Sequence, residues 1–114
     1  MKVLVCGGRN YNERDTVFAI LDEIHAETVI SLIINGEASG ADWLSTLWAN
    51  NKGIPVHGEP ADWKKHGRAA GPIRNQKMMD EQRPDLVVAF PGGSGTKSMV
   101  RIADKAGVRV EVVE

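Results

Sequence analysis

The sequence has one cysteine, three histidines and no long apolar run, and each shortage excludes a class of protein. Cys6 has no partner for an internal disulfide, and the N-terminus lacks the charged-then-apolar pattern of a secretory signal, so we expect a cytoplasmic protein. No apolar run approaches the roughly 20 residues that span a bilayer, so a membrane is not an expected partner. Scattered histidines and one cysteine do not make a zinc site, and no cofactor is expected.

The chain also lacks an excess of charge of one sign. Its formal net charge is −1 at pH 7, and acidic and basic residues are interspersed. The electrostatic footprint of a duplex-binding protein is therefore missing, which argues against nucleic acid as the main partner. A length of 114 residues suffices for one hydrophobic core and is too short for two. We expect a single domain over residues 1–114, with one site.

Apolar and β-branched runs recur along the chain, each followed by glycine, proline or asparagine. They predict five strands, over residues 2–6, 29–34, 54–57, 86–90 and 108–113. Segments with helical spacing lie between them, over residues 13–27, 41–51, about 73–82 and about 95–106. This alternation predicts an α/β fold, a single Rossmann-like, doubly wound domain of about five parallel strands with helices on both faces.

Two glycine-rich turns are expected to bound a crevice in this fold. In a strand order such as 3-2-1-4-5, the winding reverses between the first and fourth strands, and ligands bind beyond their carboxyl ends. The first turn contains Gly7, Gly8 and Arg9. The second runs from the fourth strand into a helix and consists of Pro91, Gly92, Gly93, Ser94, Gly95 and Thr96. Its backbone N–H groups and the helix dipole would point at an anion, which predicts a phosphate site. The alternative is that these glycines serve only a positive φ.

Neither turn fits a widespread nucleotide-binding signature. A Walker A loop needs glycine directly before lysine, but Thr96 precedes Lys97. The turn at Gly7 and Gly8 fails the G-x-G-x-x-G spacing of dinucleotide-binding folds. An NTPase and an ordinary NAD dehydrogenase are therefore not expected.

A third glycine-rich turn, containing Gly36 and Ser39, follows the second strand and opens the next helix. Ser39 is the candidate N-cap of that helix, and Asp42 lies in its first turn. The Asp42 carboxylate either complements the helix dipole or accepts hydrogen bonds from ribose hydroxyls. Both roles stay open from the sequence.

Residues 58–72 are predicted to be irregular, and a loop that long in so small a domain favours a functional role. Asp62 and Trp63 lie within it, and Arg74 and Asn75 follow it. Arg74 would bond a phosphate through two N–H groups, or else cap a helix or pair with a surface carboxylate. Trp63 would stack on a base or simply pack. A solvated face is expected of the loop's basic residues, Lys64, Lys65, His66 and Arg68.

Five motifs, in order over nearly the whole chain, resemble the YspA-type branch of the SLOG superfamily. They are Gly7-Gly8-Arg9, Asn35-Gly36-x-Ala38-x-Gly40-Ala41-Asp42, Pro60-Ala61-Asp62-Trp63, Ala70-Gly71-Pro72-x-Arg74-Asn75-x-x-Met78 and Phe90-Pro91-Gly92-Gly93-x-Gly95-Thr96. The superfamily contains nucleotide-sensing domains and the LOG phosphoribohydrolases, which release a base from a nucleoside monophosphate. Its members are common in bacteria and phages. The resemblance implies a homodimer, and Trp43 and Trp48 are candidates for its interface or for the core.

One departure from the LOG signature P-G-G-x-G-T-x-x-E bears on catalysis: Met99 stands where the glutamate is expected. Cleavage of an N-glycosidic bond passes through an oxocarbenium-like state that a nearby carboxylate stabilises. We therefore expect LOG-type catalysis to be lost unless Asp42, Asp62 or Glu37 substitutes.

The first hypothesis is a sensor or sequestering module for a nucleoside monophosphate, a ligand related to ADP-ribose or NAD, or a cyclic nucleotide. The second is a LOG-like hydrolase of such a ligand, with Asp42 or Asp62 as the catalytic carboxylate. An adaptor for a protein partner, with a decayed site, is the third.

Overall fold

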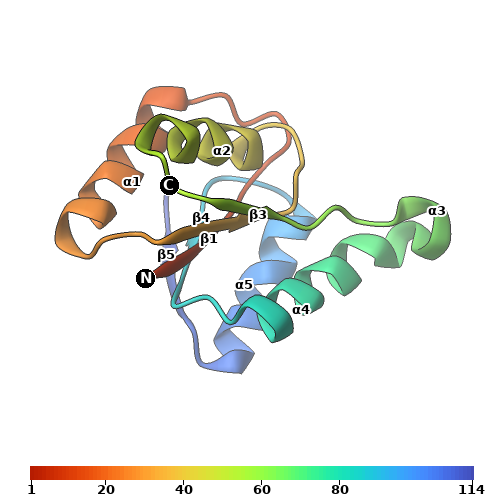
Figure 1. The fold of residues 1–114 in the computed structure, drawn as a ribbon. Helices are drawn as coiled ribbons and strands as arrows, with labels where there is room; N and C mark the ends of the chain where they lie inside the picture. The colour runs from red at the N-terminus through yellow and green to blue at the C-terminus, as the bar shows by residue number, and fades with distance from the viewer.

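The protein forms one five-stranded parallel sheet with helices on both faces (Figure 1), in a computed structural model that describes residues 1–114. The strands are β1 (Lys2–Cys6), β2 (Leu32–Asn35), β3 (Val56–Gly58), β4 (Leu86–Ala89) and β5 (Arg109–Val112). Their order across the sheet is β3-β2-β1-β4-β5, and all neighbouring pairs are parallel. The predicted α/β fold is confirmed.

The helices divide between the two faces of the sheet. Their bounds are α1 (Arg14–Glu27), α2 (Ala41–Lys52), α3 (Trp63–His66), a 3₁₀ turn (Gly67–Ala69), α4 (Ala70–Gln82) and α5 (Ser94–Ala106). Helices α1 and α2 cover one face, and α4 and α5 cover the other (Figure 1). None of the helices combines the length and apolarity needed to cross a membrane.

The hydrophobic core of the domain has two halves, one on each face of the sheet, because successive side chains of a strand point to opposite faces. Val3 and Val5 of β1 belong to the half that contains Trp48 of α2. Leu4, between them, belongs to the other half, with Met99 of α5. Helices on both faces explain why β1 reads as an unbroken apolar run rather than an alternating one.

The segment predicted to be irregular, residues 58–72, is mostly helical. Only residues 59–62 are without regular structure, and α4 begins at Ala70 instead of near residue 73. Pro72 suggested a boundary, but it lies in the first turn of α4. A proline is tolerated there because the first N–H groups of a helix have no intrahelical acceptor in any case.

Strands β1 and β4 end side by side, which places the turns that follow them together. Cys6 pairs in register with Ala89, so the segments that follow β1 and β4 leave the sheet at the same level. The segment after β1 leads to α1 on one face of the sheet, and the segment after β4 leads to α5 on the opposite face (Figure 1). This divergence opens the crevice in which doubly wound folds bind their ligands.

Candidate functional site

A cleft of about 920 Å³ lies beyond the carboxyl ends of β1 and β4. Its volume is within the range of roughly 300–1,000 Å³ that is usual for small-molecule sites. It is lined by the turns after β1, β2 and β4, by α3 and α4, and by one face of α5. The structure brings together these residues predicted from the sequence: Gly7, Gly8, Arg9, Gly36, Asp42, Trp63, Arg74, Asn75, Pro91, Gly92, Gly93, Ser94, Gly95 and Thr96. Two predicted residues, Ser39 and Asp62, do not line the cleft.

Helix α5 starts at the cleft with no side chain capping it. Gly93 occupies the N-cap position, and no side-chain hydrogen bond closes this end. The N–H of Lys97 is bonded to the carbonyl of Gly93 at 3.1 Å, as the helix requires. The N–H groups of the three residues before Lys97 have no intrahelical acceptor, and all three residues line the cleft. The positive end of the helix dipole therefore faces open space.

The glycines of this turn are not explained by backbone conformation, because Gly92, Gly93 and Gly95 all lack a positive φ. Gly92 is required by packing, since a β-carbon on it would lie 2.7 Å from the backbone nitrogen of Gly8. A β-carbon on Gly93 or Gly95 would meet no protein atom within 4 Å. The idea that these glycines serve only a positive φ is therefore wrong, and two of them leave free space in the cleft.

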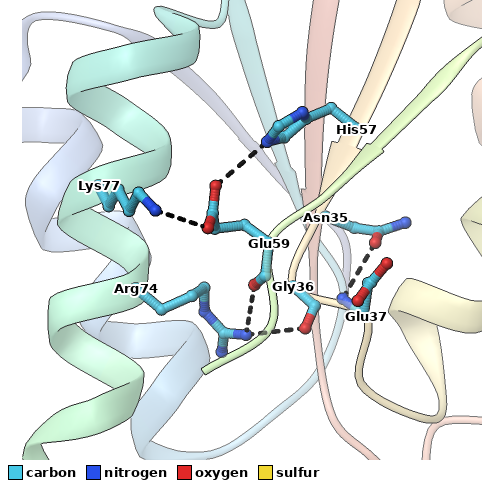
Figure 2. A network of polar contacts seen from close by, with 7 residues as sticks. All are labelled: Asn35, Gly36, Glu37, His57, Glu59, Arg74 and Lys77. Atoms are coloured by element: carbon cyan, nitrogen blue, oxygen red, sulfur yellow. Dashed lines mark hydrogen bonds and ion pairs between the residues drawn. The ribbon is translucent and has the colours of Figure 1, made fainter. Parts of the chain in front are cut away.

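Arg74 of α4 is held in place by three acceptors beside the cleft, and Figure 2 shows the two on Gly36 and Glu59. Its Nη1 donates to the carbonyl oxygens of Gly36 at 2.8 Å and Glu59 at 3.3 Å, and its Nε donates to Asn75 Oδ1 at 2.9 Å. It neither caps a helix nor pairs with a surface carboxylate. Burial lowers the pKa of Arg74 from its usual value, and the remaining Nη2 donates to no protein atom.

Glu59 fixes the segment whose carbonyl holds Arg74. Its carboxylate lies 3.2 Å from His57 Nε2 and 3.0 Å from Lys77 Nζ (Figure 2). Its backbone N–H donates to the carbonyl of Asn35 at 2.9 Å. The hydrogen bonds with His57 and then Lys77 lower the pKa of Glu59. The contacts of Glu59 thus connect β2, β3 and α4 beside the Arg74 side chain.

The Asp42 carboxylate closes the turn between β2 and α2. It is 6% exposed, and its Oδ2 accepts hydrogen bonds from the N–H groups of Gly36 at 3.1 Å and Ala38 at 3.2 Å. Burial raises the pKa of Asp42 to about 6. Oδ1 accepts no hydrogen bond from the protein, so contact with a ribose hydroxyl stays a prediction for that atom.

Ser39 does not cap α2, contrary to the sequence prediction. The N-cap is Gly40, at a φ of 77°, and no side chain closes the helix. The N–H of Ala41 instead donates to the carbonyl of Gly8 at 3.2 Å, which a local sequence pattern cannot reveal. The Ser39 hydroxyl donates to the carbonyl of Arg9 at 3.0 Å, so it joins the first and third predicted turns.

Asp62 has a structural contact of its own. Its side chain accepts a hydrogen bond of 3.1 Å from the N–H of Lys65 and thereby caps α3. Trp63, the next residue, lines the cleft and is 47% exposed. The guanidinium carbon of Arg9 lies 5.1 Å from the centroid of the Trp63 ring, within cation–π range. A base that stacked on the same face of the Trp63 ring would displace Arg9.

Cys6 and Met99 restrict the chemistry of the cleft. Met99, at the position of the LOG glutamate, is fully buried in the core beneath α5 and does not line the cleft. Asp42 is consequently the one acidic residue in the lining. The Cys6 thiol also lines it, but burial raises the pKa of Cys6 to about 12, which suppresses the thiolate.

Two arginines in the lining were missed by the sequence analysis. Arg68, interpreted there as part of a solvated face, lies along the cleft, and so does Arg101 of α5. A signal for Arg101 was available, because Ser94, Ser98 and Arg101 are spaced four and three residues apart and share one helix face. No comparable periodicity marks Arg68, which lies in the 3₁₀ turn.

Comparisons with known proteins identify the family. The family model of the YspA, cpYpsA-related SLOG family matches residues 1–66, from β1 to the end of α3. The Gene 61 protein of Mycobacterium phage D29 is 38% identical to this chain over 117 residues, an alignment that covers 96% of this chain and 93% of that protein. The predicted resemblance to this family is confirmed, with three of the five sequence motifs inside the matched residues, and the chain belongs to the YspA, cpYpsA-related SLOG family.

Proposed function

We propose that the protein binds a nucleotide, or a ligand derived from one, with a phosphate group at the N-terminus of α5. The observation that carries the proposal concerns Gly93 and Gly95. Neither a positive φ nor close packing requires glycine at these two positions. The space they leave adjoins the three free N–H groups of the helix end. Such an end binds phosphate through its N–H groups and its dipole together.

Arg74 supports the same assignment from the other side of the cleft. Its Nε and Nη1 are engaged by the protein, so the guanidinium is held before a ligand arrives, and Nη2 stays available. A hydrogen bond from a guanidinium to phosphate is charge-assisted and stronger than a neutral one. Membership of the SLOG family suggests a nucleotide-related ligand or a LOG-like function. Asp42 Oδ1 would accept a ribose hydroxyl, and Trp63 would stack on the base.

Binding without turnover, as in a sensor or a sequestering module, suits the position of Met99. Since Met99 is in the core, the cleft has no carboxylate at the position that the LOG signature assigns to glutamate. Asp62 is engaged at the start of α3. The second candidate, hydrolysis, depends on Asp42 alone, and one observation favours it: a carboxylic acid whose pKa is about 6 can exchange a proton near neutral pH.

Thermal unfolding with AMP, ADP-ribose, NAD and cyclic AMP tests the binding proposal. A ligand at about 100 times its Kd stabilises the folded state by roughly 2.7 kcal/mol, which raises Tm on the order of 10 °C in a domain of this size. We expect Gly93→Val and Arg74→Gln to reduce the shift. Arg109→Gln is the matched control, because Arg109 is exposed at the opposite end of the sheet, where β5 begins. No shift with any of these compounds would contradict the proposal.

Chromatography of the same mixtures separates the two candidate functions. The binding function predicts that no free base or ribose phosphate accumulates on prolonged incubation. Release of base that is abolished by Asp42→Asn would establish the hydrolase instead. Arg109→Gln again serves as the control for general loss of activity.

We also propose that the protein self-associates as a dimer. Trp48 is fully buried in the core, so it is unavailable to a partner, whereas Trp43 is 55% exposed on α2. Light scattering of the purified protein, with Trp43→Ser as a variant, tests this. The mass of a single chain at working concentration would contradict it.

A further inference from the structure

The charged residues of the chain are sorted unevenly between the cleft and the rest of the surface. The sequence has seven arginines and seven lysines. Four of the arginines line the cleft, Arg9, Arg68, Arg74 and Arg101, and no lysine does. Of the 15 acidic residues, Asp42 alone is in the lining. An almost neutral protein thus has one strongly positive concavity, which would focus field lines on an anion.

None of the four arginines forms an ion pair with a carboxylate, although the charge of Asp42 acts on Arg9 and Arg74 from within the cleft. The ion pairs of the protein join Lys52 to Asp22, and His57 and Lys77 to Glu59. Arg9 lies over the ring of Trp63, and Arg74 donates only to carbonyl and amide oxygens. Arg68 and Arg101 have no hydrogen-bond acceptor in the protein.

The four guanidinium groups come from four different parts of the chain. Arg9 follows β1, Arg68 is in the 3₁₀ turn, and Arg74 and Arg101 are on α4 and α5. Arg101 is seven residues beyond Ser94, which is two turns and roughly 10 Å along the axis of α5. The positive charge is therefore spread around the cleft and is not concentrated at the helix N-terminus.

One phosphate group does not account for this distribution. A phosphate monoester has a charge of about −1.5 to −2, and the helix end contributes roughly +0.5. Arg74 and the α5 N-terminus together would neutralise most of that charge and leave three arginines, Arg9, Arg68 and Arg101, with only the Asp42 carboxylate to oppose them. Arginine rather than lysine also suits phosphate, because its planar fork bonds two oxygens at once.

We infer that the ligand has at least two phosphoryl groups, as a nucleoside diphosphate or a diphosphate-bridged nucleotide has. This inference rests on the proposed function, since it specifies the ligand of the same cleft. The first phosphoryl group binds at the N-terminus of α5 with Arg74. The second lies toward Arg101 and Arg68, and Arg9 leaves Trp63 to join it when a base stacks on that ring.

Calorimetric titration with AMP against ADP, and GMP against GDP, tests the inference. For whichever base binds, we expect the diphosphate to bind at least about tenfold more tightly, because its second phosphoryl group adds charge-assisted hydrogen bonds. The affinity for the diphosphate should also fall more steeply with increasing salt than the affinity for the monophosphate. Arg101→Gln and Arg68→Gln should each weaken the diphosphate several-fold and leave the monophosphate within about twofold. Arg109→Gln should change neither.

The outcomes separate this inference from the proposed function. The inference would be overturned, and nucleotide binding left intact, if monophosphate and diphosphate bound with equal affinity and if Arg101→Gln and Arg68→Gln changed neither affinity. Failure of every nucleotide to bind would overturn both. A short single-stranded oligothymidylate that binds more tightly than either diphosphate, and loses affinity in Arg101→Gln, would replace the small-molecule ligand with a nucleic-acid strand.

Discussion

The side-chain amide of Asn75 on α4 donates a hydrogen bond of 3.2 Å to the carbonyl oxygen of Gly95, in the first turn of α5. The same amide accepts a hydrogen bond of 2.9 Å from Nε of Arg74. The Asn75 side chain is 4% exposed, and both bonds are partly buried. One amide therefore sets the position of a guanidinium and of a helix end, which we propose contact the same phosphate.

The first prediction concerns that amide. Asn75→Ala removes both hydrogen bonds and leaves the Gly95 carbonyl and Arg74 Nε without partners. We expect the free energy of unfolding to fall by about 1–3 kcal/mol, and the affinity for the diphosphate to fall on the order of tenfold. Urea denaturation and calorimetry measure the two effects. Gln76→Ala is the control, because Gln76 is exposed and its amide contacts only Asp80. Wild-type affinity in Asn75→Ala would show that the amide has no role in positioning.

Much of the fold and the site could be predicted from the sequence. Strand and helix periodicities, with the rule that ligands bind at the winding reversal, placed the turns at Gly7 and Gly93 together. These features depend on local patterns and on general topology. Phosphate binding by the turn after Phe90 stays a prediction, which rests on the glycine and hydroxyl residues that lead directly into a helix.

The missed features depend on contacts between distant segments. Ser39 has the sequence signature of an N-cap, but the first N–H group of α2 donates to the carbonyl of Gly8 instead. Asp62 looked like a site carboxylate, although it caps a helix that was not predicted. Arg68 and Arg101 are 33 positions apart and meet at one cleft only because α4 and α5 pack on the same face. No local pattern contains that information.

The second prediction compares two glycines whose β-carbons would both meet open space. Gly95 lacks a positive φ and lies in the first turn of α5, whereas Gly53 ends α2 at a φ of 70°. Gly95→Ala should raise the free energy of unfolding by up to about 1 kcal/mol, since alanine favours the helix. Gly53→Ala should lower it by about 1 kcal/mol, since alanine is strained at positive φ.

The same pair separates stability from binding. We expect Gly95→Ala to weaken nucleotide binding while it stabilises the fold, because its methyl group enters the space proposed for the phosphate. Gly53→Ala should leave the nucleotide affinity unchanged. Paired urea titrations and calorimetry provide both quantities, and undiminished affinity in Gly95→Ala would place the phosphate elsewhere.

The third prediction is a pH dependence caused by Asp42. Burial raises the pKa of Asp42 from 3.8 to about 6 in the folded protein. Between those values the folded protein binds the proton more tightly than the unfolded chain, so the free energy of unfolding decreases as pH rises through this window. The contribution of the neutral acid is fully present below pH 3.8 and is lost above about pH 6. A shift of this size corresponds to roughly 3 kcal/mol.

Asp42→Asn tests this because asparagine keeps an oxygen for the N–H groups of Gly36 and Ala38 and does not titrate. Urea denaturation at several pH values from 4.5 to 7.5 should show wild type losing stability relative to Asp42→Asn as the pH rises. Asp22→Asn is the control: Asp22 is exposed, and its hydrogen bond with Trp48 lowers its pKa, so its contribution to stability changes only at a pH below about 3.8 and this variant should parallel wild type over the measured range. Parallel pH profiles for wild type and Asp42→Asn would contradict the assignment.

The fourth prediction is that the Cys6 thiol resists alkylation although it lines the cleft. Burial raises the pKa of Cys6 to about 12, with a further increase from the Asp42 carboxylate. Since the thiolate is the nucleophile, an ordinary pKa near 8.5 in the unfolded chain would give on the order of a thousandfold more thiolate at pH 8. Iodoacetamide should therefore modify the folded protein about a thousandfold more slowly than the urea-denatured chain. Cys6 is the only cysteine, so the mass increase reports on this thiol alone.

The variant Asp42→Asn should raise the rate of alkylation in the folded state, because it removes the nearby negative charge. Equal rates for folded and denatured protein would show that the thiol is freely ionised in the cleft.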